Sequence, residues 1–199
     1  MQARLKDINN DLKDVNNVCE NQRGEIIKLR GQIIEIKSPS SGIYNKHLRN
    51  IIESVLEYIG LKDNEIDKWT KLLILTVATE SDNGTFTRQV NGPARSIFQV
   101  EPETEKEAMK WACKHRKEMY EKIKKLRCKA HLSVHEGEYN IGYATALAYI
   151  VYLSKGVKLR NNSNAEDLAK IHKKYYNTIK GKGSVKRTLA KLKEFRINL

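Results

Sequence analysis

The sequence contains few of the residues that cross-link or stiffen a small protein. Of its 199 residues, three are proline and three are cysteine, namely Cys19, Cys113 and Cys128. An odd number of cysteines without metal-ligand spacing argues against a disulfide framework and against a structural zinc site. We therefore expect reduced, mostly structural thiols, and we expect neither a bound metal nor a cofactor.

Long apolar segments are also missing. No run of about twenty apolar residues, the length that crosses a bilayer, occurs in the chain. The first residues, MQARLKDINNDLKD, lack the apolar core of a secretory signal. The sequence therefore predicts no membrane span and no signal peptide.

Aromatic residues make up 7% of the chain and apolar residues 40%, which is enough for a modest core. Lys, Glu, Leu, Ile and Ala are abundant, and these residues favour helix over sheet. We predict a mainly α fold with one domain and an appendage.

The formal charge of +13 is unevenly distributed along the chain. From Lys170 onward, ten basic residues face one acidic residue, Glu194. A basic surface suits any polyanion, such as nucleic acid, membrane phosphate or an anionic cell wall. Because the chain has no recognisable nucleic-acid motif or aromatic stacking platform, we expect no specific nucleic-acid recognition.

Residues 5–36 carry the clearest periodicity in the sequence. Apolar residues recur there at alternating spacings of three and four, interrupted near the middle by Cys19 and Gln22. This pattern predicts an oligomerising coiled coil over residues 1–37, although a helix packed on its own domain is the alternative. The narrow seam and polar flanks favour self-association, with the number of chains left open. Residues 38–42 form a linker, and a globular domain is predicted over 43–199.

Four helices are predicted in the first three quarters of this domain, over residues 47–60, 64–79, 104–126 and 139–153. A further helix pair is predicted from Asn164 onward. The 104–126 helix is expected to open with a capping box of Thr104 and Glu107. Residues 82–95, with Asn83-Gly84 and Gly92-Pro93, are predicted to form a small hairpin or an ordered loop.

The candidate catalytic residue is Glu80, which follows an apolar run that reads LLILTVAT from residue 72. Burial disfavours the ionised form of a carboxylate, so a glutamate at the edge of a buried helix is a candidate general acid. A helix-end cap or salt bridge is the structural alternative for the same residue.

The residues after Glu80 carry a resemblance to a known family. Glu80-Ser81 is followed by a segment reading GPARSIFQ from Gly92 to Gln99, and then by Pro102 and Thr104. This order resembles the Glu-Ser, Gly-Ala-x-Gly-Leu-Met-Gln and Pro-x-Thr motif of the soluble lytic transglycosylases, which belong to the lysozyme-like superfamily. The chain departs from that motif at Ser96, where the family has its second glycine, and Arg95 precedes it.

The resemblance implies a lysozyme-like helical domain that cleaves peptidoglycan glycan strands with Glu80 as the catalytic acid and base. It also implies substrate-binding roles for Ser81, Gln99, Tyr176 and Asn177. Tyr176-Asn177 is similar to the family's Tyr-Asn-x-Gly element. Tyr139-Asn140-Ile141-Gly142 spells that element more literally, but the family order places it after an alanine-rich middle helix, which favours Tyr176.

The resemblance further points to diverged members found in bacteriophage particles, and so to a virion protein or one that resides in the host cytoplasm before assembly or release. Other virion proteins are then candidate partners. Two alternatives stay open. Hydrolysis would require a second carboxylate, for which Asp82, Glu101 and Glu103 are available. A catalytically inactive structural or wall-binding module of the virion would agree with Arg95-Ser96 and the oligomerising segment.

Overall fold

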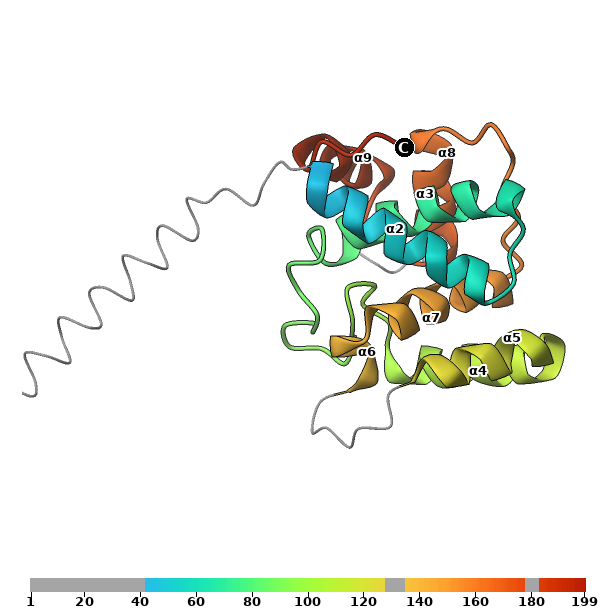
Figure 1. The fold of residues 1–199 in the computed structure, drawn as a ribbon. Helices are drawn as coiled ribbons and strands as arrows, with labels where there is room; N and C mark the ends of the chain where they lie inside the picture. The colour runs from blue at the N-terminus through green and yellow to red at the C-terminus, as the bar shows by residue number, and fades with distance from the viewer. Residues whose placement is uncertain (1–41, 128–134, 178–182) are drawn as a thin grey trace, which may run out of the picture. The chain divides into compact units, whose positions relative to one another are not determined.

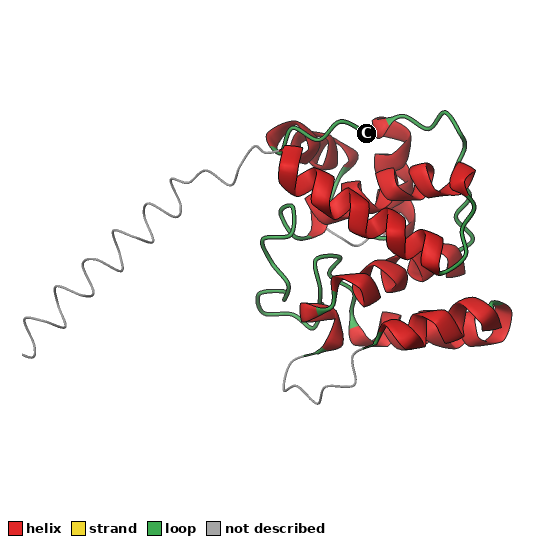
Figure 2. Cartoon of the chain, viewed as in Figure 1, coloured by secondary structure: helices red, strands yellow, loops and turns green. Residues whose placement is uncertain are grey.

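The computed structural model describes residues 42–127, 135–177 and 183–199. The predicted coiled coil, residues 1–37, lies outside the described residues, as does all but the last residue of the 38–42 linker. The chain divides into two units, of which the second is Ile43–Leu199. Within the described residues the fold is mainly α, as predicted, with eight helices and no strand (Figures 1 and 2).

The helices follow one another along the chain with short connections. They are α2 (Gly42–Tyr58), α3 (Asp63–Glu80), α4 (Pro102–His115), α5 (Lys117–Leu126), α6 (Glu136–Tyr139), α7 (Ile141–Ser154), α8 (Ala165–Tyr175) and α9 (Val185–Glu194). The predicted helices over 47–60 and 64–79 correspond to α2 and α3. The predicted helix pair from Asn164 corresponds to α8 and α9, with Asn164 capping α8.

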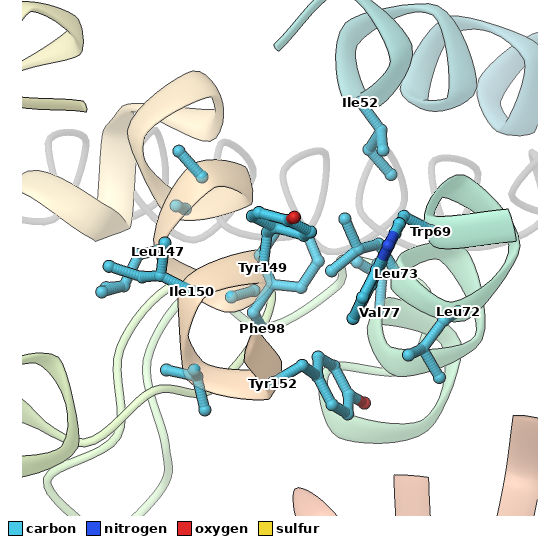
Figure 3. Close-up of a cluster of buried hydrophobic side chains, with 14 of the residues drawn as sticks. Ile52, Trp69, Leu72, Leu73, Val77, Phe98, Leu147, Tyr149, Ile150 and Tyr152 are labelled. Carbon is cyan, nitrogen blue, oxygen red and sulfur yellow. The ribbon is translucent and has the colours of Figure 1, made fainter. Parts of the chain in front are cut away.

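Two apolar helices, α3 and α7, form the centre of the core. Every residue of α7 from Tyr143 to Tyr152 is buried, and so are nearly all residues of α3 from Trp69 to Ala78. A helix that is apolar on all sides must be covered on all sides. The indole of Trp69 packs edge to face against the ring of Tyr149, with the ring centres 4.8 Å apart. Both residues belong to the buried cluster drawn in Figure 3.

The remaining helices cover these two. Helices α4 and α5 pack on α7, whereas α8 and α9 pack on α3 and on each other (Figure 1). The ends of α3 and α8 are thereby brought together, and Glu80 contacts Asn177 across 97 residues of sequence. This packing is what places the candidate site.

The predicted continuous helix over 104–126 is wrong in two respects. It begins at Pro102, because proline is pre-organised for the first turn of a helix, and Thr104 and Glu107 form no capping box. It also breaks at Arg116, whose backbone (φ −144°, ψ 58°) is not helical, so that α4 and α5 are separate. The break lets α5 bury Ile123 in the core.

The segment from Ser81 to Glu101 forms a loop with no strand. Isolated antiparallel bridges join Arg95 to Arg88 and to Val100. Arg95 also pairs with Glu138 of α6 at 3.2 Å, so its side chain is held against the neighbouring helix. The sequence predicted either a small hairpin or an ordered loop over residues 82–95, and the structure has an ordered loop.

Candidate functional site

Glu80 is the last residue of α3, and its side chain keeps 18% of its surface open to solvent. The helix ends there because Asp82, Asn83 and Gly84 all have left-handed backbones, with φ of 49°, 57° and 84°. Asp, Asn and Gly are the residues that adopt this conformation most readily. The local sequence thus fixes a carboxyl group at the boundary between the core and the loop.

Ser81 supports the turn and does not contact the carboxyl group. Its buried hydroxyl donates to the backbone oxygen of Val77 at 3.0 Å and accepts from the backbone N–H of Gly84 at 3.0 Å. It therefore fixes the direction in which the chain leaves α3. The substrate-binding role that the resemblance implies for Ser81 stays a prediction.

The end of α8 brings His172, Tyr176 and Asn177 to Glu80. The Nε2 atom of His172 lies 2.9 Å from Oε1 of Glu80, and only 1% of the His172 side chain is exposed. Nε2 makes no well-aligned hydrogen bond, so the two atoms are in close contact without hydrogen-bond geometry. The Nδ2 group of Asn177 donates to the same Oε1 atom over 3.4 Å.

The orientation of the Asn177 amide follows from its other partners. Its Oδ1 atom accepts from the backbone N–H of Gly183 and from Nζ of Lys173, both at 3.3 Å. Both of these groups are donors, so the amide oxygen must face them and the nitrogen must face Glu80. Asn177 is thereby held as a donor to the carboxyl group.

Tyr176 joins α8 to the loop on the other side of the site. Its hydroxyl donates to the backbone oxygen of Phe98 at 2.9 Å. Its ring stacks on the ring of His172, with the ring centres 5.7 Å apart. Burial raises the pKa of Tyr176 well above its usual value, with further contributions from Tyr152 and Glu80. The phenol is therefore neutral and acts as a donor.

Tyr152 of α7 forms the floor behind Tyr176, with the two ring centres 4.8 Å apart. Its hydroxyl lies 2.7 Å from Oγ1 of Thr76, which already donates its one hydrogen to the backbone oxygen of Leu72. Tyr152 must therefore be the donor in the pair. Burial raises the pKa of Tyr152 far above its usual value, and the charge of Glu80 raises it further.

Gln99 braces the loop. Its Nε2 group donates to the backbone oxygens of Ser96 at 2.8 Å and Phe86 at 3.1 Å. Ser96 and Gln99 both have left-handed backbones, with φ of 72° and 50°. The position where the resembled family has glycine is thus one where the backbone conformation favours glycine.

The three carboxylates available for hydrolysis are arranged differently from Glu80. Asp82 pairs with Lys191 of α9 at 2.9 Å, and this hydrogen bond raises the pKa of Lys191. Glu101 and Glu103 are exposed at the start of α4, and Glu103 lies 3.4 Å from Lys106. None of them bonds to Glu80 or its partners in the described part of the chain.

The alternative Tyr-Asn pair has a structural role. Asn140 caps α7 by accepting from the backbone N–H of Tyr143 at 2.9 Å, and its amide donates to Glu136 at 2.6 Å and to the Leu126 backbone oxygen at 2.8 Å. Tyr139 donates to Glu136 at 3.1 Å. No contact between this pair and Glu80 occurs among the described residues.

Sequence interpretation did not assign His172 to the site, although it lies 2.9 Å from Glu80. It precedes Tyr176 by four residues, a spacing that places both side chains on one face of a helix. A buried histidine one turn before the Tyr-Asn pair was therefore a usable signal. As for metals, the described residues contain no group of three His, Cys, Asp or Glu side chains able to hold one.

Comparisons with protein-family models, with curated proteins and with solved structures found no match. The function is therefore inferred from the residues of the site and their geometry. Within residues 42–127, 135–177 and 183–199, no helix combines the length and the apolar character needed to cross a membrane.

Proposed function

We propose that this protein cleaves the glycan strands of peptidoglycan as a lytic transglycosylase, with Glu80 as both acid and base. Glu80 protonates the glycosidic oxygen between N-acetylmuramic acid and N-acetylglucosamine, and the C1–O bond breaks. The resulting carboxylate then removes the proton of the muramic acid C6 hydroxyl while that oxygen bonds to C1. The product is an anhydro sugar, and no water is consumed.

The observation that carries this proposal is the meeting of Glu80 with Asn177 across 97 residues of sequence. The resemblance alone paired the Glu-Ser motif with the Tyr-Asn motif. In the structure, Asn177 of the second motif donates to the carboxyl group of Glu80 in the first. The side chain is largely removed from water, lies beside neutral phenols and an amide donor, and keeps 18% of its surface exposed. Such an environment suits a group that must both give and accept a proton.

The partners of the neighbouring carboxylates favour a mechanism with one carboxylate. A hydrolase needs a second carboxylate to activate water or to attack the sugar. Asp82, the nearest in sequence, pairs with Lys191 of α9 at 2.9 Å. A transglycosylase needs no second carboxylate, because the substrate supplies its own nucleophile.

The test uses the full chain, its Glu80→Gln variant and its Asp82→Asn variant. Each is incubated with purified peptidoglycan, and soluble products are identified by mass spectrometry. We expect anhydromuramyl ends from the unmodified protein and from Asp82→Asn, and none from Glu80→Gln. Circular dichroism and thermal unfolding serve as controls for folding.

Two other outcomes would redirect the assignment. Reducing ends that disappear in Asp82→Asn would identify a hydrolase with Asp82 as its second carboxylate. Binding to peptidoglycan without any product would contradict the enzymatic proposal and leave the structural or wall-binding role. Residence on a phage particle rests on the resemblance alone, and detection of the chain in purified particles would test it.

A further inference from the structure

The two oxygens of the Glu80 carboxyl group have different surroundings. Oε1 is contacted by His172 at 2.9 Å and by Asn177 at 3.4 Å. No group of the described residues bonds to Oε2. A carboxyl group that donates a proton to a substrate needs one oxygen that is not engaged by the protein.

We propose that His172 is a positioning residue that holds Oε1 of Glu80 and stabilises its ionised form, leaving Oε2 to carry the transferred proton. This inference rests on the proposed function, because it assigns separate tasks to the two oxygens of the proposed acid. His172 exchanges no proton with the substrate. It acts through Glu80, at the stage when the carboxyl group has given up one proton and has not yet taken the next.

Electrostatics supports this role. Between the two steps Glu80 is an anion, and an anion in a partly buried site is stabilised by nearby donors and positive charge. His172 lies within direct contact distance and is almost fully buried, so its interaction with Glu80 is weakly screened by solvent. Asn177 adds a fixed amide dipole on the same oxygen.

The other polar and charged groups around the pair cannot replace His172. Tyr152 and Tyr176 face the site from α7 and from the end of α8, and both remain neutral because burial holds their pKa values above the usual range. Among the described residues, Lys173 donates to Asn177, and Lys191 of α9 pairs with Asp82. His172 is the group that lies 2.9 Å from Oε1 of Glu80.

The geometry of His172 also allows a clean substitution. Its ring stacks on Tyr176, with an interplanar angle of 21°. His172→Phe keeps a ring of similar size for this stacking and removes the contact with Oε1. His172→Gln supplies a polar, uncharged side chain in the same place. Comparing the two variants separates the effect of the ring's packing on Tyr176 from the effect of the polar contact with Glu80.

The kinetic test measures kcat and KM on soluble glycan fragments for the full chain and both variants. We expect His172→Phe to lower kcat by about tenfold or more with little change in KM, since the loss affects only the reacting carboxyl group. His172→Gln should recover part of the loss. Unchanged kcat in a stably folded His172→Phe variant would overturn the inference.

A second measurement does not require activity. The ring resonances of His172 are recorded by NMR in the unmodified protein and in Glu80→Gln, and His172→Gln identifies the signal. Because Oε1 of Glu80 lies 2.9 Å from Nε2 of His172, loss of the carboxylate should shift the Nε2 resonance in the Glu80→Gln variant. An unchanged resonance would show that the contact carries no coupling and would refute the role given to His172.

The two measurements distinguish the inference from the proposed function. A shifted His172 resonance together with reduced kcat supports both. A shifted resonance in a protein that releases no glycan products would refute the transglycosylase, and with it the catalytic task of His172, while the coupling with Glu80 would stand.

Discussion

Tyr176 and Phe98 connect the two halves of the site. The hydroxyl of Tyr176 donates to the backbone oxygen of Phe98 at 2.9 Å, across 78 residues of sequence. Phe98 is fully buried and lies in the loop braced by Gln99. The hydrogen bond therefore ties the end of α8 to the loop that follows Glu80.

Replacing Tyr176 by Phe should destabilise the protein and lower its activity. The substitution keeps the stacked ring and leaves a buried backbone oxygen without its donor, which costs about 1–3 kcal/mol. Denaturant unfolding measures the loss, and product release from peptidoglycan measures the activity. Tyr175→Phe is the matched control, because the Tyr175 hydroxyl makes no hydrogen bond in the described part of the chain. Equal stabilities of the two variants would contradict the role of the Tyr176 hydroxyl.

We predict that Asn177 can reach Glu80 because Gly183 has no side chain to block its amide. A Cβ atom at Gly183 would lie 2.7 Å from Nδ2 of Asn177, closer than such atoms approach. We expect Gly183→Ala to displace the amide from Glu80 and to reduce turnover to the level of Asn177→Ala, with little loss of stability.

Gly142→Ala provides the control for this experiment. A Cβ atom there meets its nearest neighbour at 3.5 Å, which is ordinary contact, and alanine favours helix. Turnover should be unchanged in this variant. Full activity of Gly183→Ala would show that the position of Asn177 does not depend on the glycine.

Ser96 is predicted to carry backbone strain that glycine would relieve. Its φ of 72° is left-handed, and its hydroxyl accepts from the backbone N–H of Phe98 at 3.1 Å. Ser96→Gly and Ser96→Ala both lose that hydrogen bond and differ only in the Cβ atom. The glycine variant should be the more stable by about 1 kcal/mol, the usual cost of this conformation for a residue with a side chain. Chemical denaturation of both variants tests the order.

Stability should fall at alkaline pH because of four buried tyrosines. Burial is the main cause that raises the pKa of Tyr149 to about 12 and the pKa values of Tyr143, Tyr152 and Tyr176 above their usual range. In the unfolded chain these phenols ionise near pH 10, whereas in the folded protein they keep their protons. The unfolded state then binds fewer protons, so the free energy of unfolding decreases as pH rises.

The stabilising effect of the tyrosines is fully present below about pH 10 and is lost above it, at about 1.4 kcal/mol for each pH unit and each tyrosine. Thermal unfolding between pH 9 and about pH 11.5, with tyrosinate absorbance as a parallel signal, follows the loss. Tyr152→Phe should make the slope shallower by one proton. An unchanged slope would mean that Tyr152 already ionises in the folded protein.

The sequence predicted those parts of the fold that depend on neighbours along the chain. The apolar run before Glu80 and the alanine-rich run after Asn140 predicted helices, and both became the buried centre of the core. The order of motifs also favoured Tyr176 and Asn177 over Tyr139 and Asn140, and the structure places Tyr176 and Asn177 beside Glu80. The roles of these residues remain proposals.

Other features could not be predicted because local patterns do not encode them. The break at Arg116 contains neither proline nor glycine, so no residue that usually ends a helix marks it in the sequence. The hydrogen bonds of the Ser81 hydroxyl to the backbone were also not predicted, because the turn that ends α3 brings these partners within reach.

The sequence by itself determined that the chain is mainly helical and that a glutamate stands at the end of a buried helix. These properties follow from apolar periodicity and from residues that end helices, which act over a few positions. Only the tertiary structure decided that His172 and Asn177 both contact Oε1 of Glu80. It also decided that Asp82 forms an ion pair with Lys191. Such contacts arise when α8 and α9 pack on α3, and packing depends on the shapes of surfaces that are distant in the sequence.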